Sequence, residues 1–149
     1  MVQKGIILKV LVLIKFNFNI GVIVMSYDID FLKEMLDVKT NETEFQNVGS
    51  LNYTSNMKGF FVDFFENFGG LNSLNGLSGR DVVDAIDDFN LRIELKYANG
   101  RTYKETLVLL AQEYDPKNSW GSVHGALNLL NDIKEIAVRY PSAVCSVTC

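Results

Sequence analysis

The chain has 149 residues, of which 48% are hydrophobic and 21% are charged, a composition that supports one domain with a buried core. All 18 acidic residues but only 11 of the 14 basic ones follow residue 24, so the rest of the chain carries a net charge of about −7. Such a charge repels phosphate backbones and anionic lipid surfaces, which argues against sequence-independent nucleic-acid binding and favours a partner protein with a basic surface.

Residues 1–24 form a hydrophobic segment with a composition of its own. Lys9 and Lys15 interrupt its apolar runs, no small-residue cleavage pattern follows, and it lacks the roughly 20 consecutive apolar residues of a membrane span. Met25 is followed by Ser-Tyr-Asp, which is typical of a protein start. We therefore interpret residues 1–24 as a non-native upstream extension and residues 25–149 as a single globular domain. A hydrophobic N-terminal anchor or an added strand is the alternative.

The domain is predicted to begin with a strand and a loop. Tyr27, Ile29 and Phe31 alternate with aspartates, which is typical of a half-buried strand. Residues 32–36 fit a strand and a short helix equally well. Residues 39–50 are polar and predict a loop.

The capping residues Thr54-Ser55-Asn56 predict the start of a helix that Gly69-Gly70 ends. Apolar residues recur there at steps of three and four and predict its buried face: Met57, Phe60, Phe61, Phe64, Phe65 and Phe68. We interpret this stripe as core packing rather than as a ligand slot.

Residues 78–97 are predicted to hold a second helix and then a strand. Ser78 and Asp81 are spaced as a capping box. The inward positions of this helix are Val82, Val83, Ile86 and Phe89. Residues 91–97 alternate between apolar and polar side chains, which predicts a strand with one solvated face, and Asn99-Gly100 predicts a turn.

Two further helices are predicted in the C-terminal part. Thr102 and Glu105 form a capping box for the first, and the second occupies about residues 119–139. Residues 143–147 predict a short final strand. Together these elements indicate an α+β fold, a single compact domain in which a small sheet is packed by about four helices.

The residue patterns of common catalytic and metal sites do not occur in the sequence. His124 is the only histidine, Cys145 and Cys149 supply at most half of a metal site, and no nucleophile has a base at a suitable spacing. We therefore expect no catalytic residue, no metal and no cofactor. Two cysteines are too few for a disulfide framework and no export signal precedes them, so we expect a cytoplasmic location without membrane contact.

Four aspartates gather on the second helix, at Asp81, Asp84, Asp87 and Asp88. A divalent cation would need a second carboxylate pair nearby, so we interpret the cluster as a solvated face. It is also the acidic interaction face that we predict for a basic partner.

The segment from Asn118 to Leu127 is the other candidate site, because it holds the only tryptophan and the only histidine. With Ser119 as the N-cap, the N–H groups of the first turn are open to an anion, Trp120 supplies a stacking surface and His124 a charge that changes near neutral pH. Gly121 and Gly125 have no side chains that would shield these N–H groups. The alternative is that Trp120 fills the core and the glycines permit close packing.

Five short motifs occur together in this chain. They are MSYDI at residues 25–29, LNYTSN at 51–56, Asp87-Asp88, Ser119-Trp120-Gly121 and Pro141-x-Ala-Val144. In combination they resemble a family of small bacterial and phage-borne proteins without assigned function. Residues 89–113 depart from that pattern because the family members are shorter there. The glycine-threonine stretch usual between the first strand and the Asn-x-Thr segment is also missing.

The resemblance implies a single soluble domain in a mobile-element setting and implies no reaction. Any site shared with the family would use the polar positions within its motifs, which are Asn52, Thr54, Asn56, Trp120 and Gly121.

Two hypotheses of function follow. The first is a non-catalytic acidic interaction protein of phage or prophage type that inhibits a host nucleic-acid-handling or defence protein by presenting carboxylates where phosphates bind. The second is a domain that binds a nucleotide or another small anion, or acts on it, at the start of the last helix, using Trp120 and His124 together with Asn52 and Asn56. A shared concave pocket would favour the second hypothesis.

Overall fold

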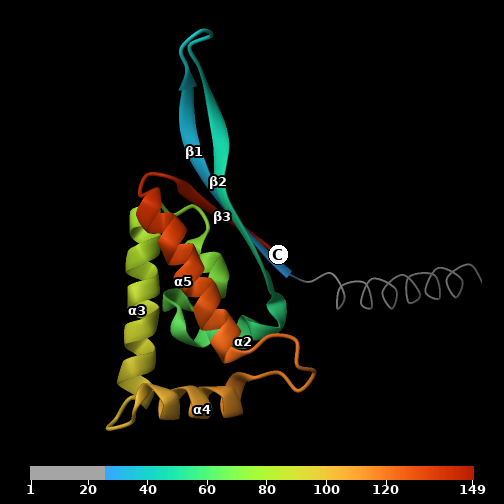
Figure 1. Ribbon diagram of the computed structural model, residues 1–149, viewed down its shortest axis with the longest axis vertical. Helices are drawn as coiled ribbons and strands as arrows, with labels where there is room; N and C mark the ends of the chain where they lie inside the picture. The colour runs from blue at the N-terminus through green and yellow to red at the C-terminus, as the bar shows by residue number, and fades with distance from the viewer. Residues whose placement is uncertain (1–25) are drawn as a thin grey trace, which may run out of the picture.

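The computed structural model describes residues 26–149 (Figure 1). Within that range, three strands form an antiparallel sheet in the order β2-β1-β3, accompanied by four α-helices and short 3₁₀ segments. The strands are β1 (Ser26–Asp37), β2 (Glu42–Thr54) and β3 (Val144–Thr148). The helices are α2 (Lys58–Phe64), α3 (Gly79–Tyr97), α4 (Tyr103–Tyr114) and α5 (Val123–Arg139). The predicted α+β fold is confirmed.

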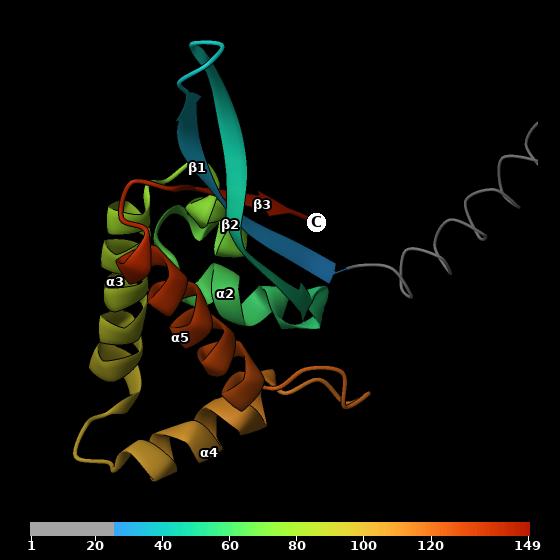
Figure 2. The same ribbon diagram turned by 45° about the horizontal axis from the view of Figure 1, so that its top comes forward.

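Strands β1 and β2 form a hairpin that projects beyond the helices (Figures 1 and 2). Tyr27 lies opposite Tyr53, and a bulge interrupts the register between Phe31 and Leu32. Strand β3 pairs only with residues 28–32 of β1, so the outer part of the hairpin consists of two strands alone.

The outer part of the hairpin differs from the prediction for residues 39–50 and shows which of the two alternatives for residues 32–36 is correct. Residues 39–50 were predicted as a loop, but only residues 38–41 form the turn, and β2 begins at Glu42. Residues 32–36 continue β1 as a strand. The side chains of residues 42–47 are all exposed, so the ribbon has no buried face to impose an apolar alternation on its sequence.

The core lies between one face of the sheet and the buried faces of helices α2, α3 and α5. Phe61 contacts Tyr27 and Tyr53 edge-on, with ring centroids 6.1 and 6.3 Å apart. The predicted apolar stripe is buried at five positions, which are Met57, Phe60, Phe61, Phe64 and Phe65. Phe68 is instead 78% exposed, because α2 ends at Phe64 and the extended backbone of Phe65 begins a separate 3₁₀ turn, η2 (Glu66–Phe68).

The strand predicted at residues 91–97 is wrong, because α3 continues to Tyr97. Ile93 and Tyr97 are buried, four residues apart, whereas Leu95 is 77% exposed. The inward positions therefore follow Ile86 and Phe89 at helical spacing rather than every second residue. The N-terminal prediction is confirmed, since the Ser78 hydroxyl accepts a hydrogen bond from the backbone N–H of Asp81 at 3.2 Å.

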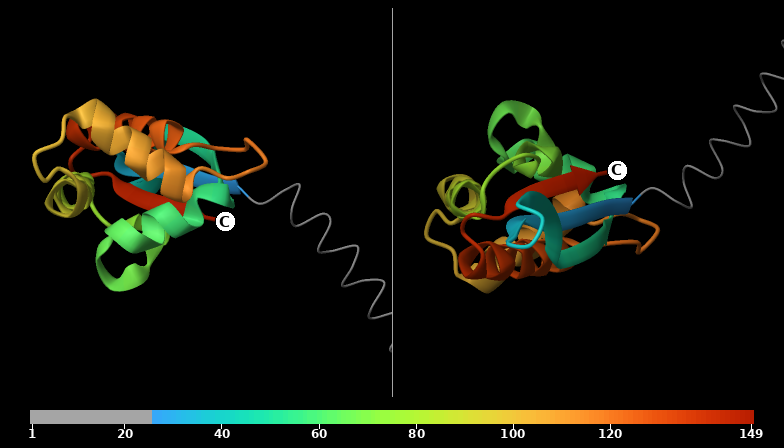
Figure 3. Two further views of the ribbon diagram at one scale, coloured as in Figure 1. Left: turned by 90° about the horizontal axis from the view of Figure 1, so that it is seen from below. Right: turned by 90° about the horizontal axis from the view of Figure 1, so that it is seen from above.

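Helix α4 crosses below the ends of α3 and α5, and Figure 3 shows it across the view while α3 appears end-on. The predicted capping box of Thr102 and Glu105 is present at its start. Two tyrosine hydroxyls tie it to the rest of the domain, since Tyr97 donates to Glu113 and Tyr114 donates to Asp63. Burial, followed by the hydrogen bond to Glu113, raises the pKa of Tyr97 to about 12.

Candidate functional site

The loop that precedes α5 does not have the predicted geometry. Helix α5 begins at Val123, and its N-cap is Ser122, whose hydroxyl accepts a hydrogen bond from the N–H of Gly125 at 2.9 Å. Ser119 was predicted as the cap, but its φ of 61° places it in the left-handed region within the loop. Trp120 and Gly121 consequently lie before the helix and not in its first turn.

Two N–H groups in the first turn of α5, those of Val123 and Gly125, already have acceptors within the protein. The Asp115 carboxylate accepts a hydrogen bond from the N–H of Val123 at 2.7 Å. The Tyr53 hydroxyl donates to the carbonyl of Ser122 at 3.1 Å and so joins the end of β2 to this corner. An anion at the helix N-terminus would have to displace the negatively charged Asp115, which weakens the case for an anion site here.

The structure brings some of the predicted polar residues together and separates others. Thr54 lies beside Gly121, where an added Cβ would stand 2.8 Å from the Thr54 methyl group. Thr54 also caps η1 (Ser55–Met57) by accepting from the N–H of Asn56 at 3.3 Å. Asn56 and His124 are exposed near this corner.

Asn52 lies on the face of the sheet opposite to that of its neighbour Tyr53. Its side chain donates to the Asp28 carboxylate at 2.6 Å, whereas the neighbouring Tyr53 points toward Phe61 and the helices. The hydrogen bonds of the Asn52 side chain go to Ser26 and Asp28 of β1, and none within the described residues reaches the loop before α5.

Trp120 is 61% exposed and is the only tryptophan, so fluorescence tests this corner directly. We expect emission at the wavelength of a solvated indole and quenching by acrylamide nearly as efficient as for a free tryptophan derivative. Blue-shifted emission protected from the quencher would contradict the exposed placement of Trp120.

The acidic face of α3 divides into two parts. Asp87 turns toward α5 and forms an ion pair with Lys134 at 2.5 Å. Asp88 pairs with Arg92 at 2.7 Å, one helical turn further on. Asp84 is exposed without a hydrogen bond or ion pair within residues 26–149.

Three of the four predicted aspartates line one surface depression of about 480 Å³. They are Asp81, Asp84 and Asp88, and η2 adds Glu66 from across the depression. Phe65 and Leu77 form part of its wall. We call this depression the acidic recess. Glu66 could not be predicted as part of this surface, because nothing in the spacing of the sequence indicates that η2 folds against α3.

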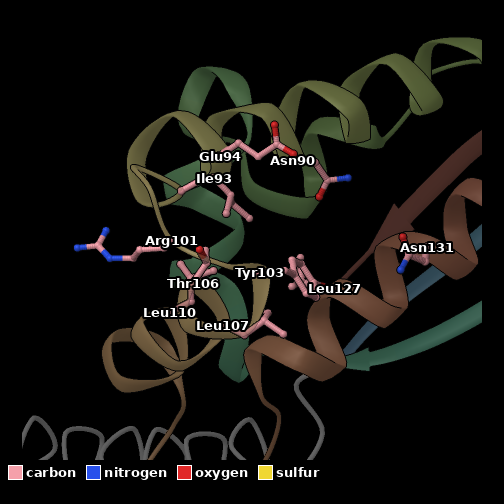
Figure 4. A pocket seen from close by; sticks show the side chains of 11 residues that line it. Asn90, Ile93, Glu94, Arg101, Tyr103, Thr106, Leu107, Leu110, Leu127 and Asn131 are labelled. Atoms are coloured by element: carbon pink, nitrogen blue, oxygen red, sulfur yellow. The ribbon is translucent and has the colours of Figure 1, made fainter.

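A second cavity lies between α3, α4 and α5 and encloses about 400 Å³ (Figure 4). Its apolar lining comes from all three helices and includes Ile93, Leu107, Leu110 and Leu127. Asn90 of α3 and Asn131 of α5 add polar groups. We call it the interhelical pocket. This pocket was not predicted, because residues 91–97 were predicted as a strand. The signal that could have revealed it is the helical spacing of Ile86, Phe89, Ile93 and Tyr97.

The two cysteines face different environments. Cys145 is fully buried on the inward face of β3, and burial, with a smaller contribution from Asp30, raises the pKa of its thiol to about 12. Cys149 is exposed at the end of the chain. Within residues 26–149, no three His, Cys, Asp or Glu residues gather closely enough to hold a metal ion.

Comparison with protein-family models, curated proteins and solved structures gave no match. Among the helices of residues 26–149, none has the length and apolar character to cross a bilayer. The acidic recess and the interhelical pocket therefore stand as candidate sites on their geometry alone.

Proposed function

We propose that this protein is a non-catalytic interaction protein that binds a basic protein surface through the acidic recess. The observation that carries the proposal is the convergence of Asp81, Asp84, Asp88 and Glu66 on one depression. Carboxylates on facing elements form a concave negative surface, which concentrates the electrostatic field and attracts a cationic group.

Within residues 26–149, most carboxylates of the recess are not neutralised by basic side chains of the protein itself. Arg92 is paired with Asp88, and it is the only basic residue that forms an ion pair with a lining carboxylate in the described part of the chain. Asp84 and Glu66 form no ion pair there. The net charge of about −7 beyond residue 24 adds long-range attraction to a basic partner and speeds the encounter.

An exposed aromatic side chain belongs to η2, the same 3₁₀ turn that supplies Glu66 to the recess. Phe68 follows Glu66 in η2, is 78% exposed and has a left-handed backbone with φ of 55°. Aromatic residues are enriched in the buried centres of interfaces, whereas charges supply specificity around them. A partner segment that combines lysine or arginine with an apolar side chain matches this arrangement.

The partner class follows from the same chemistry. A protein that handles nucleic acid presents a basic surface shaped to receive phosphates, and clustered carboxylates are able to occupy it in their place. Together with the phage or prophage setting implied by the family resemblance, this leads us to propose inhibition of a host nucleic-acid-handling or defence protein in the cytoplasm. The loop before α5 supports a small-anion site less well, because Asp115 occupies the helix start.

The test uses two charge-matched variants in affinity capture from bacterial lysate. Glu66→Gln/Asp84→Asn removes two charges from the recess, and Asp132→Asn/Glu135→Gln removes two exposed charges from α5. We expect the recess variant to retain about tenfold less of a basic captured protein at low salt and the α5 variant to behave as wild type. Equal losses in both variants would show that only net charge matters and would contradict the proposal.

A further inference from the structure

The interhelical pocket has a defined polar edge set by the pairing of two antiparallel helices. The ion pair between Asp87 and Lys134 links α3 to α5 and shows which residues of the two helices lie side by side. Asn90 lies three residues after Asp87 in α3, and Asn131 lies three residues before Lys134 in α5. Because the two helices are antiparallel, these asparagines lie at the same height along the helix pair, and both line the pocket. Two side-chain amides from separate helices thus belong to the lining of the same cavity.

These amides are available to a ligand. Neither side chain takes part in a hydrogen bond or ion pair within the described residues; Asn90 is half-buried and Asn131 is exposed. Each amide offers a carbonyl acceptor and an NH₂ donor, so the pair is suited to a planar group that presents a donor and an acceptor side by side. Asparagine makes such a two-point contact with the edge of adenine.

The remaining lining suits a flat apolar ring without a phosphate. Ile93 and Leu110 are buried side chains of the wall, and the lining also includes Leu107, Leu127, Ala98, Tyr103 and Thr106. Glu94 is an exposed carboxylate on the rim, which repels phosphate and is able to accept hydrogen bonds from sugar hydroxyls. Arg101 donates to the carbonyl of Tyr97 at 2.9 Å and points away from the other lining side chains (Figure 4).

We propose that the interhelical pocket binds an uncharged purine nucleoside. The base lies between the leucine and isoleucine side chains and presents its donor–acceptor edge to Asn90 and Asn131, and the ribose lies toward Glu94. A volume of about 400 Å³ is within the range of small-molecule sites. The pocket lies on the opposite side of α3 from the acidic recess, so this inference does not depend on the proposed function.

The experiment is a titration of the ¹⁵N-labelled full chain with adenosine, followed by NMR. We expect saturable shifts of the side-chain amide signals of Asn90 and Asn131, with a dissociation constant between about 10 µM and 1 mM. Adenosine monophosphate should bind about tenfold more weakly, because its phosphate approaches Glu94 within a strongly acidic domain.

Two variants and one matched control make the outcome decisive. Leu107→Trp fills the pocket and should abolish the shifts, whereas Val108→Trp places the same side chain on the exposed face of α4 and should leave them unchanged. Asn131→Leu keeps an apolar lining and should weaken binding at least about tenfold, a readout that remains if Leu107→Trp does not fold.

Three results would overturn the inference. They are no saturable shift with adenosine, equal adenosine binding by the folded Leu107→Trp and Val108→Trp variants, and adenosine monophosphate binding as tightly as adenosine.

Discussion

Replacing Phe89 with alanine should lower the free energy of unfolding by about 3–5 kcal/mol. Phe89 has no exposed surface and joins α3 to the aromatic cluster of α2. Its ring lies 4.6 Å from that of Phe65, 5.4 Å from that of Phe60 and 5.7 Å from that of Phe64, measured between centroids. Removal of the ring leaves a cavity bounded by side chains that are already close-packed, and these cannot collapse to fill it.

Urea unfolding followed by far-ultraviolet circular dichroism measures this loss, and Leu95→Ala is the matched control on the same helix. Leu95 is 77% exposed, so its truncation should change the free energy of unfolding by no more than about 0.5 kcal/mol. The predicted strand would have placed Leu95 on the same face as Ile93, and the helix places it in solvent. A large loss for Leu95→Ala, or a small one for Phe89→Ala, would contradict the packing of α3.

The parts of the fold that could be predicted from the sequence are those determined by neighbouring residues. A capping side chain and the N–H group it accepts from lie two or three positions apart, so Thr54, Ser78 and Thr102 identify helix starts without knowledge of the fold. The alternation of Tyr27, Ile29 and Phe31 likewise reports one buried face of β1. The exception is the start of α5, where Ser119 and Ser122 are equally suitable caps and tertiary contacts to Tyr53 and Asp115 select Ser122.

The parts that could not be predicted depend on contacts between distant segments. Strand β2 continues through residues 42–47 because β1 pairs with it, although no core covers that part of the hairpin. The alternation at residues 91–97 is compatible with a strand, and only the packing of Ile93 and Tyr97 against other helices selects α3.

Both candidate sites are assembled by the same kind of distant contact. The acidic recess needs Glu66 from η2, and the interhelical pocket needs side chains from three helices. The spacing along one helix predicted three aspartates of the recess, but it could not predict that Glu66 of η2 lies opposite them. The aspartate that it placed with them, Asp87, faces α5 and forms an ion pair there.

Replacing Gly79 with alanine should destabilise the domain by about 3 kcal/mol, although alanine is a better helix former than glycine. Gly79 is the first residue of α3 and lies against the end of α5. An added Cβ would overlap the carbonyl oxygen of Tyr140 and stand 2.7 Å from that of Ala137. Both are backbone atoms, so no side-chain rotation relieves the clash.

The backbone of Gly79 is also unable to retreat from that clash. Its N–H donates to the carbonyl of Ala143 at 2.8 Å, and the next N–H, that of Arg80, donates to the carbonyl of Pro141 at 3.0 Å. The matched control is Gly59→Ala in α2, where nothing lies within 4 Å of the added Cβ and stability should rise by about 0.5–1 kcal/mol. The same substitution should therefore shift the urea midpoint in opposite directions at the two sites. Shifts in the same direction would mean that α3 does not begin against the end of α5 as the structure has it.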